Sequence, residues 1–180
     1  MSKSPKETCS EWVHHHSGEL YGFAFRWCGR QDLAEDLVAE TFGEAWKSMS
    51  GLKNPEKARA WLFRILRRRC ARVAEERQKH INPLPLEGDT YTDPRNEEHR
   101  YQIQDSLQKA IQKLDEKHRL PFLAVTVEGL SCRDAAEQLG LPLGTLLNRV
   151  HRAKKELQHY LKDLEHEGPS NIQTFPGSAG

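Results

Sequence analysis

Residues 130–155 read LSCRDAAEQLGLPLGTLLNRVHRAKK, which is the pattern of two helices joined by a tight turn. Ser131, with Asp134 three residues later, predicts a capped helix start, because a serine hydroxyl can accept a hydrogen bond from that third amide. Gly140 supplies the turn, and a longer, basic helix is expected from about Leu143. The coincidence of cap, glycine and basic second helix favours a DNA-binding helix-turn-helix over a plain helical hairpin.

The second helix of such a motif enters the major groove, where its exposed early residues meet bases and phosphates. Leu146 and Val150 are expected to face the core, as is the inner face of the shorter helix, which carries Ala135, Ala136 and Leu139. The residues predicted to bind DNA in this motif are Arg133, Thr145, Asn148, Arg149, Arg152 and Lys155.

Around this motif the sequence predicts an all-α protein with two small helical domains, residues 11–80 and 99–162. Residues 81–98 contain three prolines, one glycine and five acids, which predicts a flexible acidic linker. Residues 163–180 lack apolar periodicity and predict a disordered tail. The first helix of the second domain is expected to carry Ile103, Leu107, Ala110, Ile111 and Leu114 as its apolar residues.

The first domain is expected to open with a helix over 11–28 that stops at Gly29, and a second helix from Asp32 to Met49. Asp32 and Glu35 have the spacing of a capping box. One stripe of this helix is apolar and consists of Ala34, Val38, Phe42, Ala45 and Met49. The other flank mixes leucines and acids and consists of Leu33, Asp36, Leu37, Glu40 and Glu44. Spacing alone supports equally a docking face for a basic partner and an ordinary solvated flank.

A third helix is expected from about Glu56 to Lys79, after a loop over Ser48–Pro55. Residues 51–80 hold ten bases and three acids, whereas residues 11–50 hold three bases and seven acids. One side of this helix is predicted to be a basic stripe near an aromatic ring, with Lys57, Trp61, Arg64, Arg67, Arg68 and Arg72. Such a stripe can neutralise phosphates, and an aromatic ring can support an unpaired base by stacking, which favours nucleic acid as the partner.

The 180 residues carry 27 Lys and Arg against 26 Asp and Glu, so the net charge of +1 conceals opposite local charges. No run approaches the ~20 apolar residues of a membrane span, and no secretory signal is evident, so a soluble, cytoplasmic chain is expected. The four cysteines are scattered singly, without the spacing of a zinc site or a disulfide framework.

A metal-dependent enzyme is an alternative interpretation, and it rests on His14, His15 and His16 near Cys9. Adjacent histidines on one helix point about 100° apart, which is poor ligand geometry. No nucleophile, base and orienting group occur together, so neither a metal, a cofactor nor a catalytic activity is expected.

Five segments of the chain, in order, resemble the bacterial sigma factors of the extracytoplasmic-function class. They are AEDLVAETF at 34–42, AWLFRI at 60–65, VEGLS at 127–131, LGTL at 143–146 and RVHRA at 149–153. The resemblance spans about residues 11–160 and implies a dissociable subunit of RNA polymerase that directs promoter recognition and melting. It also implies an anti-sigma factor as a partner, because sigma factors of this class are usually held inactive by one.

The resemblance implies a role for each surface. The flank of Leu33, Asp36, Leu37 and Glu40 would bind the clamp helices of the largest polymerase subunit. The basic helix and preceding loop would recognise the upstream-melting promoter element, through Asn54, Trp61, Arg64, Arg67 and Arg68. The helix-turn-helix would read the more distant element as duplex, and the linker could thread toward the polymerase active-site cleft.

Two residues depart from the family pattern. Ala39 lies where a glutamine is common in the polymerase-binding motif, and Leu147 lies where a basic residue is common on the recognition helix. The second change is expected to weaken phosphate anchoring and alter sequence preference. A stand-alone helix-turn-helix regulator that never touches polymerase is the alternative, although it leaves the acidic flank and the first basic helix unexplained.

Overall fold

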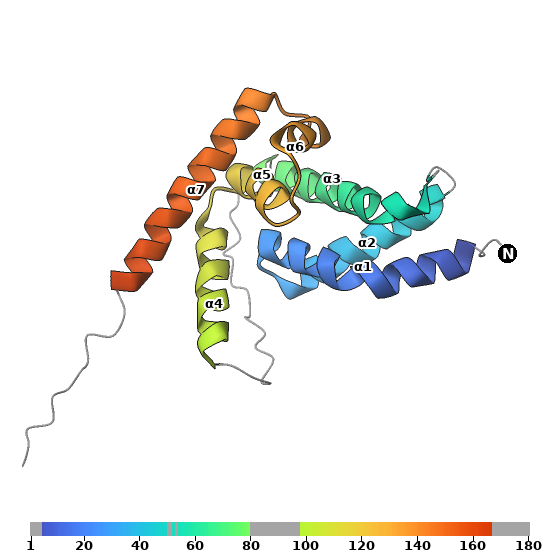
Figure 1. Ribbon diagram of the computed structural model, residues 1–180, viewed down its shortest axis with the longest axis horizontal. Helices are drawn as coiled ribbons and strands as arrows, with labels where there is room; N and C mark the ends of the chain where they lie inside the picture. Colours follow the sequence, from blue (N-terminus) through green and yellow to red (C-terminus); the bar gives the residue numbers. More distant parts are fainter. Residues whose placement is uncertain (1–4, 50–51, 53, 80–97, 167–180) are drawn as a thin grey trace, which may run out of the picture.

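The computed structural model describes residues 5–49, 52, 54–79 and 98–166, and within these ranges every regular element is a helix (Figure 1). The predicted all-α class is therefore confirmed. The elements are α1 (Pro5–Cys28), α2 (Gln31–Ser48), the short 3-10 helix η2 (Pro55–Lys57), α3 (Ala58–Lys79), α4 (Glu98–Lys113), α5 (Glu116–Thr126), α6 (Cys132–Leu139) and α7 (Leu143–His166).

Helices α1, α2 and α3 pack together into the first helical unit (Figure 1). Gly29 has φ of +69°, a left-handed conformation that ends α1 where the sequence predicted it. The rings of Phe23 and Phe63 meet edge to face at 5.7 Å and join α1 to α3. Leu20 and Trp27 of α1 are fully buried in the same core.

The predicted capping box at the start of α2 is wrong. The helix begins one residue earlier, with Arg30 as its N-cap and no side-chain hydrogen bond to the cap. The carboxylate of Asp32 instead accepts a hydrogen bond of 3.1 Å from Nε of Arg30. Asp32 therefore lies in the first turn, where a negative charge is favourable beside the helix N-terminus.

The buried side of α2 also differs from the prediction. Its fully buried residues are Ala34, Leu37, Thr41 and Ala45. Leu37 is only 1% exposed, so its placement on the exposed acidic flank is wrong. Val38, Phe42 and Met49 are only partly buried around that core. Ala34 and Ala45 belong to both the predicted and the observed stripe, whereas Leu37 and Thr41 are buried where Val38 and Phe42 were expected.

Helices α4 to α7 make the second unit, with the predicted helix-turn-helix in α6 and α7. Ala135, Leu146 and Val150 are buried in a small cluster with Ala124 of α5. Leu107 of α4 is 41% exposed, so it does not belong to the buried stripe of that helix, and the side chain of Ile103 lies outside the described residues. Helix α7 continues to His166, past the predicted tail boundary at 163.

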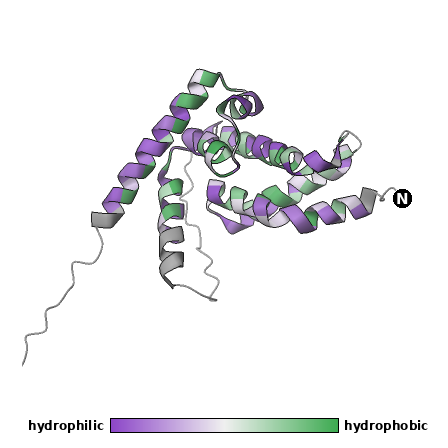
Figure 2. Ribbon diagram, viewed as in Figure 1, coloured by the Kyte–Doolittle hydropathy of each residue, from purple (hydrophilic) through white to green (hydrophobic). Residues whose placement is uncertain are grey.

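The two units share one continuous hydrophobic cluster. Ala110, Ile111 and Leu114 of α4 and the segment after it are buried in the same cluster as Trp27 of α1 and Leu66 of α3. Figure 2 shows hydrophobic residues along the facing helices and hydrophilic ones along most of α7. The predicted linker at 81–98 and the tail from 167 lie outside the described residues, apart from Glu98 at the start of α4.

Candidate polymerase and nucleic-acid interfaces

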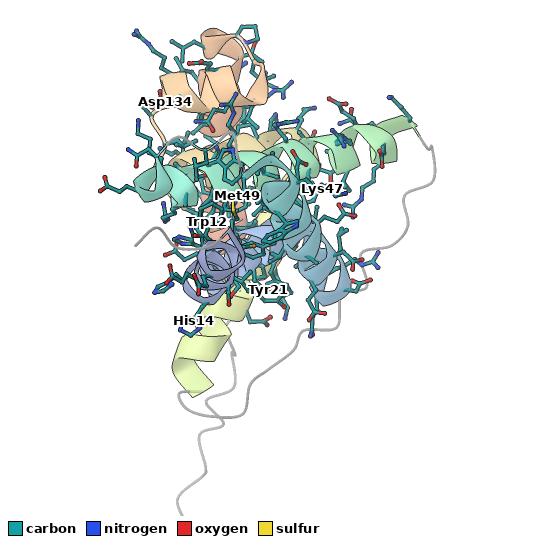
Figure 3. The ribbon with its side chains drawn as sticks, turned by 90° about the vertical axis from the view of Figure 1, so that its right-hand side faces the viewer. Trp12, His14, Tyr21, Lys47, Met49 and Asp134 are labelled. Atoms are coloured by element: carbon teal, nitrogen blue, oxygen red, sulfur yellow. The ribbon has the colours of Figure 1, made fainter. Side chains whose placement is uncertain are left out.

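The helix-turn-helix is built by local hydrogen bonds. Oγ of Ser131 accepts from the amide of Asp134 at 3.1 Å and donates to its carboxylate at 2.6 Å. Gly140 has φ of +64° and closes α6, with its amide bonded to Glu137 and the amide of Leu141 bonded to Ala136. The predicted cap and turn are confirmed. Figure 3 places Asp134 at one end of the molecule, away from Trp12 and Met49.

The predicted DNA-facing residues of this motif lie on its outer side. Leu146 and Val150 are buried, as are Ala153 and Leu157 further along α7. The helix therefore has its opposite face toward solvent, and its first turn contains no acid. Arg133, Asn148, Arg152 and Lys155 are exposed, whereas Thr145 and Arg149 are half-buried at the edges of this face.

Helix α3 presents fewer bases than its sequence suggests. Arg64, Arg68 and Arg72 are exposed on one face. Trp61 is half-buried, and its ring meets that of Trp12 edge to face at 5.8 Å. Trp12 therefore holds Trp61 in place at the side of the basic face.

Asn54 is exposed just before this helix, where its side chain accepts a hydrogen bond of 3.0 Å from the amide of Glu56. It therefore caps η2. Residues 50, 51 and 53 of the predicted loop lie outside the described residues.

The prediction that Arg67 belongs to the exposed basic stripe is wrong. Arg67 is 1% exposed, and its guanidinium donates to the side chains of Glu128 and Gln138. Glu128 follows α5 and Gln138 lies on α6, so Arg67 is a contact between the two helical units. The pattern of α3 gave no sign of this, because the partners come from residues 61 and 71 positions further along the chain.

A second group of contacts joins the units at the C-terminal end of α1. The last carbonyls of a helix have no partners within it. Gln108 donates to Phe25 O at 3.1 Å, and Gln112 donates to Arg26 O at 2.8 Å. The guanidinium of Arg119 donates to Trp27 O, also at 2.8 Å. Sequence reasoning missed these three residues, because glutamines and arginines at such spacing on a helix indicate only a polar face.

Arg119 is buried, and it also donates to the carbonyls of Gln112 and Leu114, at 2.6 and 2.8 Å. Burial lowers the pKa of its guanidinium, because the charged form loses water. A guanidinium remains charged even so, and its five donors suit a ring of carbonyl oxygens. Arg77 adds an ion pair of 3.1 Å with Glu116 at the same boundary.

The acidic flank of α2 is partly neutralised within the first unit. Asp36 is exposed and Leu33 is half-buried. Glu40 is exposed but accepts from Arg69 of α3, which also donates to Glu44 at 2.9 Å. The carboxylates of Glu40 and Glu44 are thus held in position by a half-buried arginine.

The cysteine and histidine side chains show no further assembly. Cys28 and Cys70 are buried thiols, and burial raises the pKa of both. Within the described part of the chain, no three His, Cys, Asp or Glu residues are grouped so that they could hold a metal ion. None of the helices in those ranges has the length and apolar content of a membrane span.

Similarity to known proteins shows the family of this chain. Residues 12–80 match the family model of sigma-70 region 2, and residues 104–157 match that of sigma-70 region 4. The chain is 30% identical to the ECF RNA polymerase sigma factor SigL of Mycobacterium tuberculosis over 156 residues, which cover 83% of this chain and 86% of that protein. The chain belongs to the extracytoplasmic-function (ECF) sigma factors of the sigma-70 family. This sigma factor binds core RNA polymerase and directs transcription initiation at promoters.

Other relatives support the same membership. The sigma factor is 32% identical to the ECF sigma factor SigE of Mycolicibacterium smegmatis over 84% of its own length, and it spans 60% of that relative. It is 23% identical to SigW of Bacillus subtilis, with 91% of this chain and 94% of that protein covered. The family expected from the five sequence segments is therefore confirmed.

Two solved structures share the fold. One is the sigma factor RpoE in complex with the anti-sigma factor NepR from Bartonella quintana, with a TM-score of 0.68 and 26% identity over 85% of this chain and 96% of that one. The other is CnrH in complex with the cytosolic domain of CnrY, with a TM-score of 0.58 and 22% identity over 88% and 95%. The second supports the fold alone.

Proposed function

We propose that this sigma factor divides its work among three surfaces, one for polymerase and two for promoter DNA. The single observation that carries the proposal is the separation of exposed charge. Asp36 and Glu40 are exposed on α2, whereas three arginines are exposed on one face of α3 and Arg152, Lys154 and Lys155 are exposed on α7. Residues 11–80 and 99–162 are the proposed functional domains.

The α2 flank is the proposed polymerase-binding surface, made of Leu33, Asp36 and Glu40. Leu37 is left out because it is buried in the core. A basic pair of helices on the partner would find Asp36 exposed, and would compete with Arg69 for the carboxylate of Glu40. Complementary charge of this kind favours fast association and correct register.

Helix α3 is the proposed surface for the upstream-melting element. Unstacking a base costs a few kcal/mol, and stacking on an aromatic side chain returns ~1–3 kcal/mol for each base. Trp61 offers an aromatic surface beside Arg64 and Arg68, which can neutralise phosphates. Asn54 lies at the start of the same surface. Arg67 is assigned to the contact between units rather than to DNA, since its guanidinium is taken by Glu128 and Gln138.

The helix-turn-helix is the proposed reader of the distal element as duplex. Asn148, Arg152 and Lys155 are exposed on α7, with Thr145 and Arg149 at its edges, and Arg133 is exposed on α6. Arginine and asparagine can make paired hydrogen bonds to base edges in the major groove, and lysine adds phosphate contacts.

Charge reversal tests the division of work. Asp36→Lys with Glu40→Lys should abolish association with core polymerase and leave binding to distal-element duplex unchanged. Glu35→Lys is the matched control, because Glu35 is exposed on the same helix about 100° away from Asp36. Equal loss of polymerase and duplex binding would contradict the proposal. Polymerase association that survives the double reversal would remove α2 as the docking surface.

An anti-sigma factor is the proposed regulator, because RpoE, whose solved structure is similar over most of the chain, was crystallised with one. A protein that copurifies with this sigma factor and prevents its association with core polymerase would support the proposal. We also place the sigma factor in the cytoplasm, where polymerase acts, and assign it no catalytic activity of its own.

A further inference from the structure

Two leucines at the start of α7 are exposed beside the proposed DNA-reading residues. Leu143 is 40% exposed and Leu147 is 48% exposed. They are four residues apart, so they share one side of the helix, one turn above the other. Figure 2 shows hydrophobic residues at this end of α7, which carries the turn of the helix-turn-helix.

The fold leaves a large part of each of these two leucines in water. Leu146 and Val150 of the same turns are buried and supply the contact of α7 with α5 and α6. The part of a leucine that stays in water contributes no burial energy, whereas burial of that part is favourable by ~25 cal/mol for each Å² of apolar surface removed from water. The exposed pair is thus available for an apolar contact with a partner.

The charge around the pair indicates what that partner is. Arg152, Lys154 and Lys155 are exposed on the next turns of α7, and the first turn of this helix contains no acid. A polyanion is therefore attracted to this end of the helix. In the major groove of DNA, thymine is the base that displays an apolar group, the methyl group on C5.

We propose that Leu143 and Leu147 read thymine by contact with its C5-methyl group in the distal promoter element. The inference rests on the proposed role of α7 as the recognition helix and adds a base preference to it. A basic residue at position 147 would hydrogen-bond O6 and N7 of guanine, whereas a leucine has no donor to offer them. The distal element read by this sigma factor therefore has thymine at the position where a recognition helix with a basic residue at 147 would select guanine.

Replacement of thymine by deoxyuridine removes the methyl group and leaves every hydrogen-bonding atom of the base in place. The test uses the full chain and a distal-element duplex obtained by selection from a randomised library. Each thymine is then replaced singly by deoxyuridine, and the dissociation constant is measured. Burial of one methyl group corresponds to about a fourfold change in affinity, so one or two positions should each weaken binding by about that factor.

Leu143→Ala and Leu147→Ala should each bind the thymine duplex more weakly and lose the response to deoxyuridine at one position. Leu107→Ala is the matched control, since that leucine is 41% exposed on α4, away from the motif. It should keep the full response. Leu147→Arg should move the selected base at its position from thymine to guanine.

The proposal is overturned if the native chain binds thymine and deoxyuridine duplexes equally, or if the alanine variants keep the native response. An effect of Leu143→Ala and Leu147→Ala on polymerase binding alone would also overturn it, by making the pair a protein contact. Failure of the proposed recognition helix is distinguishable: Arg149→Ala and Arg152→Ala would then leave duplex binding unchanged. Comparable thermal unfolding of all variants excludes a folding defect.

Discussion

Arg67 and Glu128 lie 61 residues apart in the chain and form an ion pair whose side chains are 1% and 3% exposed. Two charges so deeply buried are each costly alone, and their mutual attraction and hydrogen bonds offset that cost. Gln138 accepts a second hydrogen bond from the same guanidinium. The pair therefore ties α3 to the α5–α6 segment and makes each helical unit dependent on the other.

Arg67→Ala should lower the free energy of unfolding by ~3–5 kcal/mol, because it leaves the buried carboxylate of Glu128 without a partner. Urea unfolding followed by circular dichroism measures the loss. Arg59→Ala is the control, since Arg59 and Glu19 form a half-exposed pair of 2.6 Å and the change should cost less than ~1 kcal/mol. Replacing both Arg67 and Glu128 by methionine should recover most of the loss, and equal effects of Arg67→Ala and Arg59→Ala would contradict the burial argument.

Arg119→Met should destabilise the protein by about 3 kcal/mol, since each buried acceptor left unpaired costs ~1–3 kcal/mol. The affected acceptors are the carbonyls of Trp27, Gln112 and Leu114. Urea unfolding measures the change, and hydrogen exchange at the C-terminal end of α1 should accelerate with it. The stability of Arg119→Lys should lie between that of the native chain and that of Arg119→Met, because an ammonium group reaches fewer of these oxygens. A neutral effect of Arg119→Met would show that the carbonyls find other donors.

The buried thiols predict a loss of stability at alkaline pH. Burial raises the pKa of Cys28 and Cys70 above the ordinary value of 9.0, so the folded chain retains protons that the unfolded chain releases. The free energy of unfolding should therefore fall as the pH rises above about 9. Cys70→Ala should flatten this dependence, although the cavity it leaves lowers the stability at every pH. A slope identical to that of the native chain would exclude Cys70 as its source.

The same thiols should resist alkylation. Iodoacetamide at neutral pH should modify the half-buried Cys9 and Cys132 first, and Cys28 and Cys70 only in urea, because the thiolate is the reactive form. Peptide mapping by mass spectrometry identifies the modified residues. Early labelling of Cys70 in the native chain would show that the core of the first unit opens readily.

Trp61→Ala should slow promoter melting by the holoenzyme and leave distal-element binding unchanged, because it removes a stacking surface worth ~1–3 kcal/mol for one base. Fluorescence of 2-aminopurine placed in the melting element follows this step. Trp61→Phe is the control, since it keeps an aromatic ring against Trp12 and should retain most of the rate. In the native chain the centroids of the Trp12 and Trp61 rings are 5.8 Å apart. Unaltered melting by the alanine variant would assign Trp61 to packing alone.

Local sequence was enough to predict the helix-turn-helix. The cap at Ser131, the left-handed turn at Gly140 and the apolar spacing of α7 all depend on neighbours within a few residues. The end of α1 at Gly29 was predictable for the same reason. These features follow from backbone conformation and hydrogen bonds that the local sequence specifies.

The burial of Arg67 and Leu37 depends on packing between helices and could not be predicted from the pattern of their own helices. A basic helix face can lie in water, against DNA or under a second unit, and its own pattern is the same in all three cases. The spacing of Leu37 placed it on the flank of leucines and acids, and the packing of α1, α2 and α3 buries it in their shared core. The sequence alone determined the helices, the motif and the family, because these depend on short-range pattern. Only the tertiary structure determined which charged and apolar side chains remain available to polymerase and DNA, because burial depends on partners distant in the chain.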